Sequence, residues 1–298
     1  MSQAAIAAPT LKPPRPQWKS WLSLDNRYVP PAFITLILLA GQLSFGILES
    51  YERTLLAIAA SIATELVLGR IFLGKWVNLA SAYISGISVG ILLRSPDFWP
   101  YAVAAALAIS SKYVLRFRGR HLWNPSNFGI SVVLFLLPAS VAMLSIQWGN
   151  NLASMAVIWV LGSIIIWRLR RFHISATYAI SFLILALIRS WILHQPWLAE
   201  ISPITGPEYQ LFIFFMITDP KTTVRSKKGQ CLVVFCVALV EMFFRFDQSV
   251  YAELYALFWV GPVALLIEMA LDARKRRRAD AALRFSMEPS PAMPPSRG

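Results

Sequence analysis

Long apolar runs that are almost free of charge recur along the whole chain, and they constrain the fold more than any other feature. Val132–Leu137 and Phe182–Ile188 lie inside longer segments of this kind. A helix that crosses the hydrocarbon core of a bilayer needs roughly 20 such residues, and the chain offers about ten candidates. Only 14% of the 298 residues are charged, against about 25% in average soluble proteins. The sequence therefore predicts a polytopic membrane protein rather than one large soluble domain.

The predicted fold is an all-α membrane helix bundle of about ten transmembrane helices, because an open sheet edge cannot satisfy its backbone groups in hydrocarbon. The candidate spans are 31–48, 54–73, 77–93, 98–115, 127–146, 152–169, 174–193, 208–218, 229–245 and 250–271. The eighth has only about 12 residues, or roughly 18 Å of helix, short of the ~30 Å hydrocarbon core. Either it is a short helix buried among its neighbours, or the loop Ser202–Pro207 dips into the membrane.

The positions of the cations predict the side of the membrane that each connection faces. All but four of the 28 lysines and arginines fall in tails or connections that ten spans place on one side. The exceptions are Arg53, Arg94, Arg189 and Arg245. The positive-inside rule makes the cation-rich side cytoplasmic. We therefore expect a multi-pass protein of the cell inner (plasma) membrane with both termini in the cytoplasm.

The same distribution explains the formal net charge of +13. Cations near an anionic leaflet are attracted to it, so the basic run Ala273–Arg278 is predicted to anchor the chain to the surface of the lipid bilayer. No nucleic-acid partner is expected. Residues 1–30 are predicted to be a cytoplasmic tail, 31–271 the transmembrane domain, and 272–298 a basic, disordered cytoplasmic tail. Cys231 and Cys236 share one apolar segment and are expected to be core residues rather than a disulfide or a metal site.

The stretch FFMITDPKTTVRSKKGQ, which contains Asp219 and Pro220, ends an apolar run with a carboxylate and a proline. A residue before proline avoids helical dihedral angles, so the Asp219 carboxylate is expected to accept backbone N–H groups in the following turn. Thr222 and Thr223 add hydroxyl groups. This group of side chains is a candidate for binding the polar edge of a ligand. The pattern also fits a rigid cytoplasmic turn in which Asp219 caps backbone donors and balances nearby cations.

A second polar cluster occurs in RGRHLWNPSNFG, where the fifth helix begins. Proline is well placed in a first helical turn, and Asn124, Pro125 and Asn127 lie there. With Arg118 and Arg120 close by, the backbone N–H groups at the helix start predict a pocket for an anion. A phosphate-bearing or flavin-like ligand would fit it. The alternative is a helix N-cap flanked by arginines that extend to the membrane surface.

Both clusters are predicted on the cytoplasmic side, and each combines an Asx-Pro step with the start of the next helix. This similarity suggests an internal repeat of about five spans. Glu65 lies near the middle of the second span, and a carboxylate within the membrane is a candidate for an ion pathway. Its alternative is a hydrogen bond to a serine or threonine of a neighbouring helix. P-loop, GxGxxG, HExxH and paired CxxC motifs are all absent from the sequence.

The two clusters together resemble a known family. FFMITDPKTTVRSKKGQ resembles the FFMxTDPxTSPxxxKGQ segment of the D subunit of Rnf electron-transport complexes, and the B subunit of the sodium-pumping quinone reductase is similar (the RnfD/NqrB family). WNPSNFGISVVLFLLP resembles the FNPAMVGYxxLLxxFP segment of the same family, and RLRRFHISATYAISFL aligns with the stretch before its seventh helix. The resemblance extends from about Asn78 to Met269. A divergent branch encoded in enediyne biosynthesis clusters is also similar.

The resemblance implies an integral membrane subunit that takes part in electron transport, together with other membrane or redox subunits. The positions that match the family's motifs are Asn124, Pro125, Asp219, Pro220 and Thr222. The family attaches FMN through an S/T-G-A-T motif between the fifth and sixth helices, but this interval contains only SIQWGNN. The expected cofactor is therefore a non-covalent FMN or riboflavin. A transporter or a non-catalytic membrane scaffold that keeps the fold without redox chemistry is the alternative.

Overall fold

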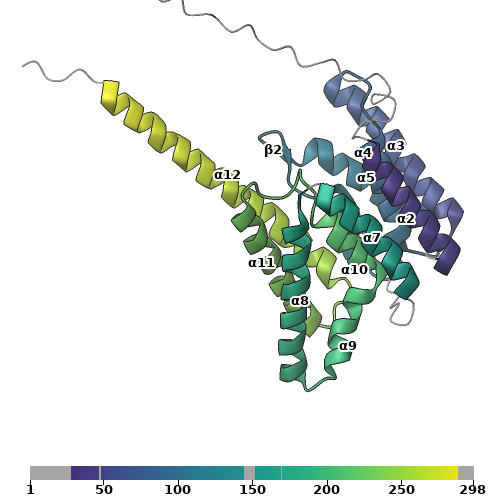
Figure 1. The fold of residues 1–298 in the computed structure, drawn as a ribbon. Helices are drawn as coiled ribbons and strands as arrows, with labels where there is room; N and C mark the ends of the chain where they lie inside the picture. Colours follow the sequence, from purple (N-terminus) through teal and green to yellow (C-terminus); the bar gives the residue numbers. More distant parts are fainter. Residues whose placement is uncertain (1–27, 47, 144–151, 169, 288–298) are drawn as a thin grey trace, which may run out of the picture.

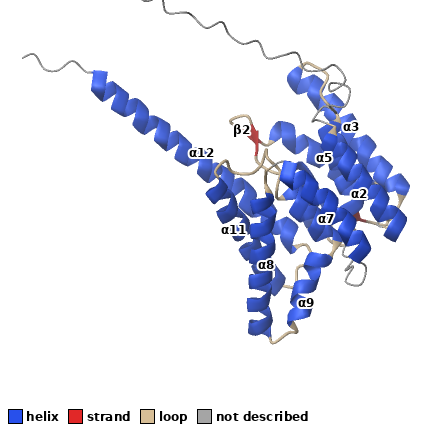
Figure 2. Ribbon diagram, in the orientation of Figure 1, coloured by secondary structure: helices blue, strands red, loops and turns tan. Residues whose placement is uncertain are grey.

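Helices make up nearly all of the regular structure of the chain in the computed structural model, which describes residues 28–46, 48–143, 152–168 and 170–287 (Figures 1 and 2). The α-helices are α2 (Val29–Phe45), α3 (Tyr51–Leu73), α4 (Ala80–Leu92), α5 (Trp99–Val114), α6 (Pro125–Leu136), α7 (Leu152–Arg168), α8 (Phe172–Leu193), α9 (Trp197–Ile201), α10 (Pro207–Leu211), α11 (Lys227–Phe246) and α12 (Ala252–Met287). Two-residue strands form two antiparallel pairs, β1 (Leu93–Arg94) with β4 (Ala142–Met143) and β2 (Arg116–Phe117) with β3 (Arg120–His121).

Four helices in the described part of the chain are long and apolar enough to cross a membrane. They are α3, α8, α11 and the Ala252–Asp280 portion of α12. Large apolar side chains such as Leu55, Ile71 and Trp191 are exposed on the bundle surface. Extensive apolar surface of this kind is expected against lipid and is unusual on a monomeric soluble protein. The chain is therefore an all-α bundle embedded in a membrane.

Two of the predicted spans are shorter than the sequence indicated. The predicted span 127–146 corresponds to α6, which has 12 residues and ends at Leu136. Leu137 precedes Pro138 and leaves the helical region, with φ −130° and ψ 46°, as the steric effect of a following proline requires. The predicted span 77–93 corresponds to the 13 residues of α4. The helix α4 continues directly into β1, and residues 137–141 connect α6 to β4, where Met143 pairs with Leu93.

The eighth predicted span is short and irregular, as its prolines indicated. A 3₁₀ turn at Ser202–Thr205 precedes α10, and α10 continues into the π-helical segment η2 (Phe212–Met216). All side chains from Pro207 to Met216 except Phe215 are buried. Of the two forms that the sequence left open, the structure has the short helix buried among its neighbours.

The last helix, α12, extends beyond the predicted tenth span and continues to Met287. The basic composition predicted a disordered tail from residue 272, but residues 272–287 are helical. Ala, Arg, Lys and Leu dominate this stretch, and all four are strong helix formers. The extension projects away from the bundle (Figure 1). The remaining tail residues, 1–27 and 288–298, lie outside the described residues.

Close contacts between small residues hold the bundle together. A Cβ atom added at Gly86 of α4 would lie 2.6 Å from the Cα atom of Ile58 on α3. A Cβ atom at Gly129 of α6 would lie 2.2 Å from the carbonyl oxygen of Ala104 on α5. Small residues let helix backbones approach in this way in membranes. The α3–α6 group and the group formed by α8, α11 and α12 also contact each other, through α6 and α12.

Candidate functional site at the Asx-Pro end

The two Asx-Pro steps, which are far apart in sequence, meet in the structure. Asn124 caps the N-terminus of α6, and its Oδ1 atom accepts a hydrogen bond from the Asn127 N–H at 3.1 Å. Its Nδ2 atom donates to Oδ2 of Asp219 at 3.2 Å. The contact joins the α5–α6 connection to the turn before α11. We call the end of the bundle that carries Asn124 and Asp219 the Asx-Pro end.

The turn at Asp219 is held by its own hydrogen bonds. Oδ1 of Asp219 accepts the Lys221 N–H at 3.0 Å, and Thr223 Oγ1 donates to the Asp219 carbonyl oxygen at 2.5 Å. Burial raises the pKa of Asp219, while the donors from Lys221, Thr222 and Asn124 oppose that rise. The carboxylate thus caps a rigid turn, as one interpretation of the sequence held, and the same turn brings it to Asn124.

The remaining polar side chains of the second cluster bind α12. Asn127 is buried and donates from Nδ2 to the Leu254 carbonyl oxygen at 3.0 Å. Arg120 donates to Oε2 of Glu268 and to the Thr223 carbonyl oxygen, both at 2.7 Å. Pro125 occupies the first turn of α6, as predicted. Arg118 donates to the Met269 carbonyl oxygen at 3.4 Å. These contacts fix the loop in place, and the two arginines point to α12 rather than to Asn124.

Glu65 is buried in an ion pair and does not stand free within the membrane. Lys112 of α5 donates to its Oε2 atom, and Tyr113 donates to its Oε1 atom at 2.9 Å. Lys112 also donates to Ser81 of α4 at 3.3 Å. The Glu65 and Lys112 side chains are both buried. The carboxylate therefore joins α3, α4 and α5, and its partners are a lysine and a tyrosine instead of the serine or threonine that the alternative named.

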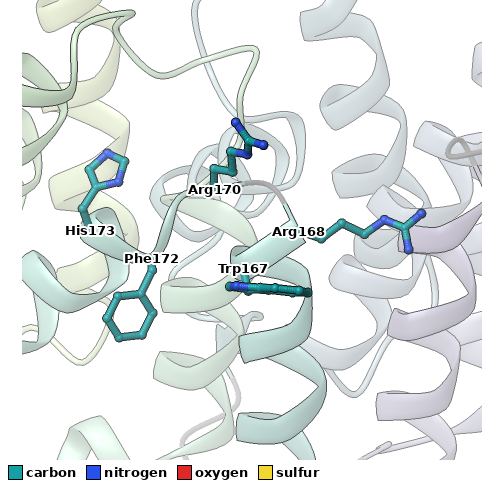
Figure 3. Close-up of a pocket in the computed structure, with 5 residues that line it drawn as sticks. All are labelled: Trp167, Arg168, Arg170, Phe172 and His173. Carbon is teal, nitrogen blue, oxygen red and sulfur yellow. The ribbon is translucent and has the colours of Figure 1, made fainter.

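A cavity that the sequence analysis did not identify opens at the connection between α7 and α8. Its volume is about 560 Å³, and its lining residues are Trp167, Arg168, Arg170, Phe172 and His173. Figure 3 shows that the Arg168 and Arg170 side chains point in different directions, with Trp167 at the end of α7 and Phe172 and His173 at the start of α8. The lining thus combines apolar ring faces with positive charge.

Arg171 connects this cavity to the Asx-Pro step. It follows the cavity residue Arg170 in the chain, and it interacts electrostatically with Asp219. Its Nη1 atom is buried and makes no hydrogen bond to any described residue. A buried guanidinium nitrogen without a partner is costly, and an anion is the partner that it prefers. The cavity is further fixed to α11 by His173, whose Nε2 atom lies 2.6 Å from Oε1 of Gln230.

The electrostatic character of the Asx-Pro end is positive. His121 lies on β3, and burial lowers its pKa to about 4, with Lys221, Arg116 and Lys112 lowering it further. Its imidazole is therefore neutral at physiological pH. Extra positive charge is disfavoured here, and an anionic ligand would be favoured. Among the described residues, no group of three or more His, Cys, Asp or Glu could hold a metal ion.

In the sequence, the cavity residues stood out only through the charge count and through the segment RLRRFHISATYAISFL, which resembles the stretch before the family's seventh helix. That count assigned Arg168, Arg170 and Arg171 to the membrane surface. The available signal was the mixture of aromatic and cationic residues between Trp167 and His173, but the helix boundary that exposes both kinds to one cavity is not apparent from composition.

No protein-family model matches the chain, and no curated protein matches its sequence significantly.

Proposed function

We propose that the chain is an integral membrane subunit of the RnfD/NqrB type that takes part in electron transport and binds a non-covalent flavin, FMN or riboflavin, at the Asx-Pro end. The observation that carries this proposal is the hydrogen bond between Asn124 and Asp219. The two segments that resemble the family's motifs lie far apart in sequence, and they form one site. That site adjoins a cavity through Arg171.

The cavity is open, because the Trp167 and Phe172 side chains are exposed, and its size and lining suit a flavin. Its volume of about 560 Å³ falls within the roughly 300–1,000 Å³ of typical small-molecule sites. Trp167 and Phe172 offer ring faces for stacking against an aromatic system. Arg170 and the unpartnered Nη1 atom of Arg171 would bind the phosphate of FMN by charge-assisted hydrogen bonds. When bound, the flavin would supply the redox chemistry, and the residues of the chain would bind and orient it.

The packing of the helices supports ten spans arranged as a five-helix repeat. In the first half α5 packs against α3 and α6, and in the second half α11 packs against α8 and α12. In this assignment α4 is the third span and α10 with η2 the eighth, and both are short and buried. Paired short segments of this kind often mark the functional region of repeated membrane folds. The evidence for the repeat is this packing and not the two Asx-Pro steps. The steps precede the fifth and ninth spans, whereas a five-span repeat would pair the fifth span with the tenth.

We further propose that the protein lies in the cell inner (plasma) membrane, with the Asx-Pro end and both termini in the cytoplasm. The cation-rich extension of α12 then runs at the cytoplasmic surface, where anionic lipids attract it. Other membrane or redox subunits would supply and accept the electrons. A transporter or a non-catalytic scaffold is the function that would remain if no flavin binds.

Absorbance and native mass spectrometry of the detergent-purified protein test this proposal. The expected result is a flavin spectrum, with a flavin mass that is lost on denaturation. Arg171→Gln is expected to lower flavin occupancy severalfold, whereas Arg225→Gln, which removes an exposed cation from the neighbouring turn, is expected to leave it unchanged. A colourless protein from flavin-replete cells that also fails to bind added FMN and riboflavin would contradict the proposal.

A further inference from the structure

The C-terminal part of α11 and the start of α12 bury a group of carboxylates that the proposed function does not use. Glu241 of α11 and Glu253 of α12 have exposed fractions of 1% and 0%. Glu241 accepts a hydrogen bond on each oxygen, from Tyr178 on Oε2 and from Tyr209 on Oε1, the latter at 2.8 Å. We call the end of the bundle that carries Glu241 and Glu253 the carboxylate end.

Glu253 differs from Glu241 because neither of its oxygen atoms accepts a hydrogen bond from the described residues. The Tyr209 hydroxyl lies close to it but donates to Glu241. An ionised carboxylate that is buried without partners is strongly destabilised in an apolar medium, and such a group takes up a proton instead. Two carboxylates that share a site also rarely both ionise.

The charged groups around the pair do not neutralise Glu253. Glu241 interacts with it from α11 and Glu208 from α10, and both are acids. Arg245 is the cation that acts on Glu241. Its guanidinium donates to the Glu200 carbonyl oxygen at 2.7 Å and to Glu200 Oε2 at 3.1 Å. Arg189 binds the same Glu200 carboxylate. The nearby arginines are thus engaged by Glu200.

A cavity at the carboxylate end provides a polar approach to the pair. Its volume is about 400 Å³, and its lining includes Glu49, Arg94, Ser140 and Tyr251. Tyr251 is two residues before Glu253. Arg94 interacts electrostatically with Glu208, and Glu208 interacts with Glu253. Tyr251, Arg94 and Glu208 are therefore the candidate polar groups for a route from the cavity to the buried carboxylates.

We infer that Glu241 and Glu253 form a proton-binding site that exchanges with water in the cavity at the carboxylate end. A hydronium ion in the cavity gives its proton to an oxygen of Glu253 and leaves as water, while Glu241 keeps its negative charge under two tyrosine hydroxyls. The proton makes the net charge of the pair −1 instead of −2. The site is separate from the cavity between α7 and α8, which neither carboxylate lines. Its nearest link to the Asx-Pro end is the hydrogen bond from Asn127 to the Leu254 carbonyl oxygen. The existence of the proton site does not depend on bound flavin.

Infrared spectroscopy of the full-length protein in lipid nanodiscs tests the inference. Near neutral pH, the wild-type protein is expected to show the C=O stretching band of a protonated carboxylic acid, and the band is expected to shift in D₂O. Glu253→Gln should abolish the band. Glu52→Gln, which removes an exposed carboxylate at the start of α3, should leave it intact. Absence of the band from the wild-type protein, or its persistence in Glu253→Gln, would overturn the inference.

Two further measurements keep the test decisive if Glu253→Gln does not fold. The first replaces choline chloride by sodium chloride around the wild-type protein, and loss of the band would show that a sodium ion, not a proton, occupies the pair. The second follows the deuterium shift after attachment of a bulky thiol reagent to Ser140→Cys in a Cys231→Ser/Cys236→Ser background. A severalfold slower shift supports exchange through the cavity, and an unchanged rate rejects that route.

Discussion

At the Asx-Pro end, Glu65 is buried beside Lys112 and also accepts a hydrogen bond from the Tyr113 hydroxyl. At the carboxylate end, Glu253 is buried just as deeply and receives no hydrogen bond from the described residues. A buried ion pair is stable only while both partners are present, whereas a buried neutral acid needs only its proton. The comparison indicates that the Glu65 carboxylate is held in a structural ion pair, whereas Glu253 has no partner that would hold a charge.

The charges of the surrounding side chains also differ between the two ends. Lys221, Arg116 and Lys112 surround His121 at the Asx-Pro end, which favours an anionic ligand. Acidic and tyrosine side chains surround Glu253 at the carboxylate end, which favours a cation as small as a proton. Intramembrane ionisable residues commonly mark functional pathways. In this chain their environment, and not their presence alone, separates a structural pair from a candidate site.

The largest expected effect comes from breaking the ion pair. Lys112→Met leaves the Glu65 charge buried and unpaired, and it is expected to lower the free energy of unfolding by about 3–5 kcal/mol. The double variant Glu65→Gln/Lys112→Met is expected to recover most of that loss, and the exposed Lys75→Met is the control. Unfolding in mixed detergent measures all three. If Lys112→Met costs no more than Lys75→Met, Glu65 is not held by this pair.

The pH dependence of the free energy of unfolding tests whether cations surround His121. Because burial and neighbouring cations lower the His121 pKa from 6.5 to about 4, the unfolded chain binds the proton more readily. The neutral His121 imidazole therefore contributes stability that is fully present above pH 6.5 and is lost as pH falls toward 4. Partial solvent contact reduces the expected loss to about 1–2 kcal/mol. Unfolding measured across this range should show the loss in wild type and His194→Asn, but not in His121→Asn.

Variants of two helix N-caps distinguish an effect on stability from an effect on the proposed ligand binding. Asn124→Ala and Ser50→Ala each remove an N-cap side chain, from α6 and from α3, and each is expected to cost about 1 kcal/mol of stability. Only Asn124→Ala also removes the contact with Asp219. Flavin titration should therefore show severalfold weaker binding for Asn124→Ala alone. Equal flavin binding by the two variants would exclude the Asn124–Asp219 contact from the site.

The smallest effect on stability is expected at the carboxylate end. Glu253→Gln replaces a neutral acid by a neutral amide of similar shape, so the free energy of unfolding is expected to change by less than about 0.5 kcal/mol or to rise. Chemical unfolding near neutral pH measures it beside Lys112→Met. A loss as large as that of Lys112→Met would mean that Glu253 is ionised and paired, and the contrast between the two ends would fail.

The sequence predicted the class of fold because apolar runs and helix formation in lipid depend on local composition. It also predicted the irregular eighth span, since prolines act on their immediate neighbours. The predicted spans for α4 and α6 were too long by several residues because the apolar runs continue past the helix ends, into β1 after α4 and to Pro138 after α6. The continuation of α12 to Met287 was missed because basic composition indicated a tail, although the same residues favour helix.

The candidate site was predictable in its parts but not in its assembly. Asn124 and Asp219 were identified from their proline neighbours, yet the contact between them depends on how α6 and α11 are placed by packing. The partner of Glu65 was not identified, because Lys112 appeared in the sequence as one more cytoplasmic cation. Glu253 drew no attention because it lies near a predicted span end, and only the structure reveals that its side chain is buried without a hydrogen-bond donor.

The central claim is that a membrane-embedded bundle presents both Asx-Pro turns at one membrane surface. Cysteine accessibility in sealed vesicles tests it most directly, with Arg118→Cys, Lys227→Cys and Ser140→Cys made separately in a Cys231→Ser/Cys236→Ser background. An impermeant thiol reagent is predicted to label Arg118→Cys and Lys227→Cys from the same side, and Ser140→Cys from the opposite side. Labelling of Arg118→Cys and Lys227→Cys from opposite sides would contradict the shared site and the topology together.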